Sequence, residues 1–353
     1  MKELYVTKKE FIWDDPSDLY NACHVSTCIK NKQGDLLAAH FGGTKEGSPD
    51  LGIWLSRRMN GRWEKPRRIK YLYGFQHWNP ILHQDGDKVI LYYKVGHGTH
   101  DWYTMVTESY DFGETWSESR EAVPDDRRPR VATKNNILVA EDGRWLGGSS
   151  VEGDLDHDCF IDISEDKGAT WNIHPIPFEH QHLPHRASIE WEGIQELWMS
   201  DPDIVLKWDG IIQPALWQSA KDTFHCLMRS SRGRIYRSDS VDGGETWCQA
   251  YPTELPNNNC GINLVQLRDK TLVLFLNPVD GNWGERTPLS AVISEDNGLT
   301  WSDYFHLETD EGEYSYPYAV TDGEMIDLTY TWRRKKIMHC EIRLKERSDR
   351  KGE

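Results

Sequence analysis

Several features that mark large protein classes are missing from this sequence. No uninterrupted apolar stretch approaches 18 residues, so we expect no membrane-spanning helix. The first residues are charged and lack the apolar core of a secretory leader, which predicts a cytoplasmic protein. The seven cysteines are odd in number and never form a Cys-x-x-Cys pair, so we expect reduced thiols and no disulfide framework. No phosphate-binding glycine loop, nucleophile elbow or nicotinamide fingerprint is present, and we therefore expect no cofactor.

Basic residues are outnumbered by acidic ones, 41 to 57, which gives a formal net charge of −16. This charge argues against nucleic acid or an anionic membrane as a partner. It does not exclude an anionic small molecule, because a local cluster of arginines can override the overall field. The hydrophobic fraction is only 38%, while 16 tryptophans and 15 tyrosines supply large anchors. This balance favours many small packed layers over one bulky core.

One pattern of eight residues, Ser-x-Asp-x-Gly-x-Thr-Trp, occurs four times in the chain. The copies are Ser109–Trp116, Ser164–Trp171, Ser240–Trp247 and Ser294–Trp301. The Asp carboxylate suits a tight turn because it can accept backbone N–H bonds, and Gly allows positive φ. Thr and Trp suit the strand that leaves the turn. The recurrence therefore predicts an array of similar β units.

The spacing of these copies indicates the number of units. Their tryptophans are 55, 76 and 54 residues apart, and a degenerate copy at Ser56–Trp63 lies 53 residues before the first intact one. Four-stranded propeller blades usually take about 40–50 residues, so we predict one blade for each copy. Residues 310–345 would make a sixth blade, completed by the N-terminal strand near Tyr5–Ile12. We predict an all-β, six-bladed propeller over residues 1–345 with a charged tail at 346–353; seven blades is the alternative.

The repeated motif is the Asp-box, and on its four copies the chain resembles the Asp-box (BNR-repeat) sialidase-like superfamily. The resemblance implies a sialidase-type propeller in which the boxes lie on the outer rim, away from the catalytic centre. Sialidases hold a substrate carboxylate with three arginines, and use a tyrosine nucleophile, a partner glutamate and an aspartate acid/base. By resemblance Arg229 and Arg286 match the second and third arginines, and Tyr316 matches the nucleophile, with Tyr314 as its rival. Glu46 or Asp50 lies where the acid/base is expected.

Two positions depart from the family pattern, and they define a divergent branch. Cys23-His24-Val25 stands where the first arginine is expected, and Gln213 replaces the glutamate. An amide cannot act as a base for the tyrosine. The imidazole of His24 titrates near neutrality and can move a proton, and His77 is a second candidate for this role. Asn79 and Tyr93 complete the candidate substrate-binding residues, together with Gln213 and Tyr314.

The resemblance implies an exo-acting enzyme that cleaves a terminal acidic sugar from a glycoside. We expect no metal, since the polar clusters at 154–158 and 180–185 are interpreted as solvated loops. A uronate-directed lyase that uses histidine and tyrosine is the first alternative, and a non-catalytic glycan-binding propeller is the second. The sequence is compatible with a homo-oligomer. About 20 additional residues near 178–207, including His180, His182 and His185, lengthen one unit and are predicted to shape the binding site.

Overall fold

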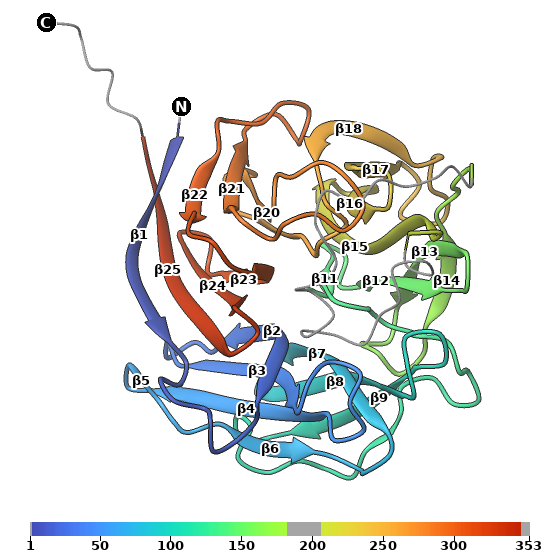
Figure 1. Ribbon diagram of the computed structural model, residues 1–353. Coiled ribbons are helices and arrows are strands. Elements are labelled where there is room, and N and C mark those ends of the chain that lie inside the picture. Colours follow the sequence, from blue (N-terminus) through green and yellow to red (C-terminus); the bar gives the residue numbers. More distant parts are fainter. Residues whose placement is uncertain (1, 182–205, 347–353) are drawn as a thin grey trace, which may run out of the picture.

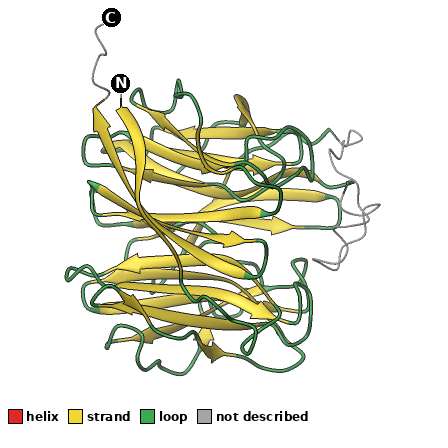
Figure 2. Ribbon diagram, turned by 60° about the vertical axis from the view of Figure 1, so that its left-hand side comes forward, coloured by secondary structure: helices red, strands yellow, loops and turns green. Residues whose placement is uncertain are grey.

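The computed structural model describes residues 2–181 and 206–346. Its described residues form 25 strands and no helix, so this part of the chain offers no apolar helix long enough to cross a membrane. The strands are arranged radially around a central axis (Figure 1), and the view from the side shows strands joined by loops throughout (Figure 2). The all-β prediction is confirmed.

The described strands group into six blades. Three of the five sheets are single four-stranded blades, one carries a fifth short strand, and an eight-stranded sheet contains two blades. The first blade consists of β2 (Ala22–Lys30), β3 (Leu36–Gly43), β4 (Gly52–Met59), β5 (Arg62–Trp63) and β6 (Arg67–Lys70). The second consists of β7 (Gln76–Asp85), β8 (Lys88–Gly96), β9 (Tyr103–Ser109) and β10 (Arg120–Glu121). The third consists of β11 (Leu138–Val139), β12 (Trp145–Glu152), β13 (Asp156–Ser164) and β14 (Asn172–Pro175).

The remaining blades continue around the ring. The fourth blade consists of β15 (Asp209–Ala220), β16 (Thr223–Ser230), β17 (Arg234–Ser240) and β18 (Tyr251–Pro256). The fifth consists of β19 (Asn263–Gln266), β20 (Leu272–Leu276), β21 (Leu289–Ser294) and β22 (Phe305–Glu308). The sixth consists of β23 (Tyr314–Thr321), β24 (Met325–Trp332), β25 (Lys336–Glu346) and β1 (Lys2–Phe11). A short parallel pairing of β13 with β15 joins the third and fourth blades into one sheet. The described chain thus has the predicted six blades and not the alternative seven.

The last blade takes its outer strand from the beginning of the chain. β1 pairs antiparallel with β25 from Lys2 opposite Glu346 to Phe11 opposite Met338. The two ends of the described chain therefore lie side by side in one sheet, as Figure 1 shows. This pairing closes the ring and covers an edge that an open array would expose.

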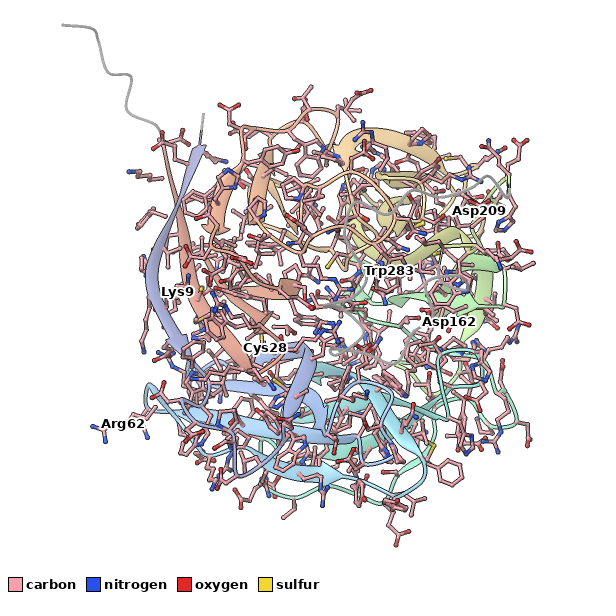
Figure 3. The ribbon with its side chains drawn as sticks, viewed as in Figure 1. Lys9, Cys28, Arg62, Asp162, Asp209 and Trp283 are labelled. Atoms are coloured by element: carbon pink, nitrogen blue, oxygen red, sulfur yellow. The ribbon has the colours of Figure 1, made fainter. Side chains whose placement is uncertain are left out.

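Each intact Asp-box forms the turn between the third and fourth strands of its blade. In the first copy Asp111 accepts hydrogen bonds from Thr115 N and Thr115 Oγ1, and Ser109 Oγ accepts one from Gly113 N. Gly113 has φ of +84°, and a Cβ there would lie 2.9 Å from the Leu37 side chain, so the position favours glycine. Figure 3 shows Arg62, in the degenerate copy, at the outer edge of the ring. The boxes are therefore elements of the fold and are remote from the axis.

The innermost strands carry a second, less obvious repeat. β2, β7, β15 and β23 each contain a β-bulge. A residue with positive φ lies at each of these bulges: Val25, Asn79, Gln213 and Tyr316. Asn259, just before β19, has positive φ as well. Bulges re-aim side chains next to functional sites, and these five residues all border one cavity on the axis.

Candidate functional site

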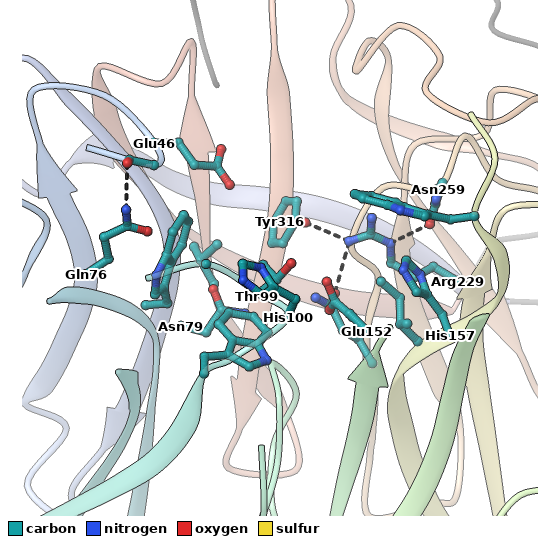
Figure 4. Close-up of a pocket in the computed structure, with 18 of the residues that line it drawn as sticks. Glu46, Gln76, Asn79, Thr99, His100, Glu152, His157, Arg229, Asn259 and Tyr316 are labelled. Atoms are coloured by element: carbon teal, nitrogen blue, oxygen red, sulfur yellow. Dashed lines mark hydrogen bonds between the residues drawn. The ribbon is translucent and has the colours of Figure 1, made fainter. Parts of the chain in front are cut away.

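A cavity of about 530 Å³ lies where the innermost strands meet (Figure 4). The five positive-φ residues named above line it, each supplied by a different part of the ring. Three arginines also line it, namely Arg229, Arg286 and Arg334. The closed ring thus brings to one place side chains that are separated by up to about three hundred positions in the sequence.

Arg229, on β16, is buried and has neutral hydrogen-bond partners. Its Nη1 lies 2.6 Å from Tyr316 Oη and 3.2 Å from Gln213 Oε1, and its Nε lies 2.9 Å from Asn259 Oδ1 (Figure 4). Among residues 2–181 and 206–346, no carboxylate forms an ion pair with this guanidinium. A buried charge that is compensated only by neutral groups is costly. Arg229 is therefore poised to take an anion from a ligand.

Arg286 and Arg334 are held by a largely buried glutamate, Glu313, that does not itself line the cavity. Glu313 Oε1 accepts from Arg286 Nη1 at 2.7 Å, and Glu313 Oε2 accepts from Arg334 Nε at 2.8 Å. Burial alone would raise the pKa of Glu313, but the two guanidinium groups outweigh it and hold this pKa well below its usual range. Glu46, a candidate acid/base, lines the cavity and forms an ion pair with Arg334 Nη1.

Arg334 is the arginine that the sequence analysis missed. It lies in the turn between β24 and β25, and its carbonyl oxygen accepts a hydrogen bond from Cys23 N at 2.8 Å. Its backbone is thus next to the Cys23-His24-Val25 segment, where the family pattern has its first arginine. Three arginines of the described chain therefore line the cavity, although the Cys23-His24-Val25 segment contains none.

Tyr316 is the tyrosine at the axis. Burial raises the pKa of its hydroxyl, although Arg229 and Arg286 partly oppose this effect. Gln213 Oε1 is a hydrogen-bond partner of Arg229, and in the described chain no carboxylate accepts a hydrogen bond from the Tyr316 hydroxyl. The tyrosine is therefore neutral at neutral pH and has no carboxylate base beside it.

His24 packs behind Tyr316 and does not line the cavity. The two ring centroids are 4.3 Å apart, and His24 Nδ1 lies 2.8 Å from Thr331 Oγ1. Burial, reinforced by the charge of Arg334, lowers the pKa of His24 well below its ordinary value. The imidazole is neutral and supports the position of the tyrosine ring.

Four other candidate residues lie outside the cavity lining. Asp50 accepts hydrogen bonds from Thr44 within its own loop. His77 stacks on Tyr93 with ring centroids 5.7 Å apart, and Tyr314 packs in the core of the last blades with its hydroxyl near Arg333. None of Asp50, His77, Tyr93 and Tyr314 borders the space that a ligand would occupy.

Glu152 is a cavity residue that no sequence signal singled out. It ends β12 and is partly buried in the cavity wall. Desolvation raises its pKa to about 7, an effect that Glu46 reinforces and that Arg229 and a hydrogen bond from Thr99 oppose. A carboxyl group in this range can exchange a proton near neutral pH.

The described residues include no group of three or more histidine, cysteine, aspartate and glutamate side chains that could hold a metal ion. His180 lies 3.0 Å from Asp158 through its Nε2 atom. His182 and His185, the other members of the histidine cluster, lie outside the described residues, as does most of the 178–207 segment.

A six-bladed ring with Asp-boxes on its rim and an arginine-lined cavity on its axis defines a sialidase-type propeller. The BNR repeat-like domain model matches residues 34–328, most of the chain, and the protein belongs to this family. A comparison with curated proteins finds no match.

Solved structures share this fold at low sequence identity. A protein of unknown function from Dyadobacter fermentans aligns with a TM-score of 0.71 and 16% identity over 97% of this chain and 99% of its own. The Hadza microbial sialidase Hz136 aligns with a TM-score of 0.70 and 18% identity over 94% of this chain and 68% of its own. Trypanosoma rangeli sialidase, in complex with the inhibitor DANA, has a TM-score of 0.64 and 13% identity; this chain spans 55% of its length.

Proposed function

We propose that this protein is an exo-acting glycoside hydrolase that cleaves a terminal acidic sugar bound in the axial cavity. The observation that carries this proposal is the environment of Arg229, which is buried and has only neutral hydrogen-bond partners in the described chain. A carboxylate on the ligand would compensate this charge, and guanidinium groups suit carboxylates because they offer paired N–H donors. A neutral sugar would leave the charge uncompensated.

The surroundings of Arg229 support the same ligand class. Arg286 and Arg334 place two further guanidinium groups in the lining of the same cavity, where the carboxylates of Glu313 and Glu46 compensate them. A volume of about 530 Å³ is within the range of small-molecule sites, roughly 300–1,000 Å³. This is space for one terminal sugar and part of its leaving group.

We assign Tyr316 as the nucleophile that attacks the anomeric carbon of the sugar. In the first step the tyrosine oxygen attacks that carbon and loses its proton to solvent, because no described carboxylate accepts it. The glycosidic bond breaks with its electron pair on the leaving oxygen, which takes up a proton. Water then attacks the same carbon, and the tyrosine oxygen leaves and is reprotonated. Arg229, 2.6 Å from the hydroxyl, stabilises the negative charge that develops on this oxygen as it attacks and again as it leaves.

A panel of fluorogenic glycosides of acidic sugars, both nonulosonic and uronic, tests the proposal. The protein should release the fluorophore from at least one of them, and Tyr316→Phe should abolish release while binding persists. Tyr110→Phe is the matched control, since Tyr110 is exposed on the rim, and it should retain full activity. Release by Tyr316→Phe at the wild-type rate would disprove the role of this tyrosine.

Elimination on a uronate is a second candidate, favoured by the neutral state of Tyr316. A base would remove the proton next to the carboxylate, the electron pair would form a carbon–carbon double bond, and Tyr316 would protonate the leaving oxygen. An unsaturated product that absorbs in the near ultraviolet would identify this reaction. A protein that forms neither product but is stabilised by an acidic sugar would be a glycan-binding propeller.

A further inference from the structure

A second hollow lies beside the axial cavity and shares part of its lining. Its volume is about 380 Å³. Five residues line both spaces: Thr99, His100, Glu152, His157 and Trp208. They come from the β8–β9 loop, the end of β12, the beginning of β13 and the segment just before β15. Glu152 therefore borders both the axial cavity and this side cavity.

Two carboxylates line the axial cavity within the described part of the chain, and their surroundings differ. Glu46 is neutralised by its ion pair with Arg334. Glu152 forms no ion pair with any described lysine or arginine, and it stands at the junction of the two cavities. Figure 4 shows Glu152 close to Thr99, His100 and His157 and on the same side of the cavity as Arg229.

We propose that Glu152 is the general acid/base of the reaction and that the side cavity receives the leaving group. This inference rests on the proposed hydrolase function and names the proton donor that the function requires. When the glycosidic C–O bond breaks, its electron pair stays on the leaving oxygen, which takes the proton from the Glu152 carboxyl. The Glu152 carboxylate then accepts a proton from the water that attacks the anomeric carbon, and the acid is restored.

The position of Glu152 agrees with its role as proton donor in the first step and proton acceptor in the second. Arg229 is close enough to influence the charge of Glu152, and it also contacts Tyr316 Oη, so the acid and the tyrosine share one neighbour. The desolvation that raises the pKa of Glu152 to about 7 keeps a large fraction of the carboxyl protonated at neutral pH.

Several other groups that carry or can carry charge line the two cavities around Glu152. They are Glu46, His97, His100, Asp154, His157, Lys207, Arg229, Arg286, Tyr316 and Arg334. Burial lowers the pKa of His157 to about 3, so this imidazole stays neutral and cannot replace Glu152 as the proton donor near pH 7. His97 and His100 lie on the exposed loop between β8 and β9.

The test compares two glycosides of the same acidic sugar, one with an activated aryl leaving group and one with a sugar or alkyl leaving group. An aryl leaving group departs without protonation, whereas a sugar alcohol needs an acid. In Glu152→Gln, kcat/KM for the alkyl or sugar glycoside should fall by about 10²- to 10⁴-fold, and the loss for the aryl glycoside should be much smaller. The basic limb of the kcat/KM–pH profile near pH 7 should disappear.

Glu46→Gln is the matched control, because it changes the other cavity carboxylate in the same way. Its losses should be equal for the two glycosides, since Glu46 acts through Arg334. Glu152→Asp keeps a carboxyl group and should retain the basic limb, which separates loss of the acid from damage to the fold.

The possible failures are distinguishable. If the wild-type protein cleaves neither glycoside, the proposed function is wrong and the role of Glu152 is wrong with it. If the wild-type protein is active and Glu152→Gln loses the same factor on both glycosides, or keeps the basic limb, only the assignment of Glu152 is overturned.

Discussion

Replacing Glu313 with glutamine would remove one negative charge from between two buried guanidinium groups. Glu313 is bonded to Arg286 at 2.7 Å and to Arg334 at 2.8 Å, and its Oε1 also accepts a hydrogen bond from Ser315 Oγ at 2.8 Å. Glutamine has nearly the same shape, so the change leaves no cavity. Its amide group, however, cannot compensate two positive charges. We expect Glu313→Gln to destabilise the protein through electrostatics alone.

The size of this effect follows from the burial of the three groups. The Glu313 side chain is only 11% exposed, and those of Arg286 and Arg334 are 6% and 2% exposed. Breaking a buried ion pair by removing one partner costs about 3–5 kcal/mol. At about 2.1 cal/mol/K per residue, this chain of 353 residues has an unfolding entropy of about 0.7 kcal/mol/K. The thermal midpoint should therefore fall by about 4–7 °C.

The pH dependence of the stabilisation by Glu313 provides a more specific test. Because the pKa of Glu313 is lower in the folded protein than in the unfolded chain, the unfolded chain binds the extra proton first as pH falls. The stabilisation by Glu313 is fully present above the unfolded pKa of about 4.3 and is lost as pH decreases towards the folded value. The difference in unfolding free energy between wild type and Glu313→Gln should be largest at pH 7 and should shrink below about pH 4.

Denaturant unfolding and differential scanning calorimetry at about pH 7, 5 and 3 would measure these differences. Glu311→Gln is the matched control, since Glu311 is exposed in the same loop, and it should change the unfolding free energy by no more than about 0.5 kcal/mol. A loss for Glu313→Gln below about 1 kcal/mol at pH 7, or a loss that grows on acidification, would refute the reasoning.

Three further predictions concern the site and the fold. Arg229→Lys should weaken the binding of an acidic sugar by about 1.5–3 kcal/mol, measured by isothermal titration calorimetry, because an ammonium group cannot reproduce the paired donors; unchanged affinity would contradict a carboxylate role for Arg229. Tyr316→Phe should keep that affinity within a few-fold while turnover is lost, and a parallel loss of binding would instead indicate a positioning role. Trp247→Ala, in an Asp-box, should lower the unfolding free energy by about 3–5 kcal/mol because the side chain is 5% exposed, without changing sugar affinity.

The fold could be predicted from the sequence because its main signal is local. All the residues that build an Asp-box turn lie within eight consecutive positions, and their contacts, such as Thr115 to Asp111, are made inside the turn. The spacing of the copies then predicts the number of blades. Short apolar runs at 35–41, 88–93 and 271–276, each after turn residues, form β3, β8 and β20.

The side chains that face the axis were harder to predict, because side-chain direction alternates along a strand and a bulge reverses the alternation. In β7 the bulge lies between Trp78 and Ile81, and it turns Asn79 into the cavity while His77 stays outside. A signal for these bulges was available: proline follows the positive-φ residue at Asn79, Gln213 and Tyr316. Proline has no N–H to donate and is tolerated where the ladder is interrupted.

Glu152 and Arg334 could not be predicted from the sequence for a different reason, because their place in the site depends on contacts between blades. Glu152 ends a strand with no motif around it, and only the adjoining loop and cavities distinguish it from other surface glutamates. Arg334 belongs to a turn with the sequence Arg333-Arg334-Lys335, which reads as an ordinary basic hairpin. Nothing local in that sequence indicates that Arg334 is only 2% exposed, with its side chain in the axial cavity.

The ring closure explains how Arg334 comes to line the cavity beside the Cys23-His24-Val25 segment. The first and last blades are neighbours, so the turn between β24 and β25 lies beside β2, and Cys23 N bonds directly to the Arg334 carbonyl. We therefore propose that Arg334, supplied by the last blade, takes the place of the arginine that the family pattern has near residue 24.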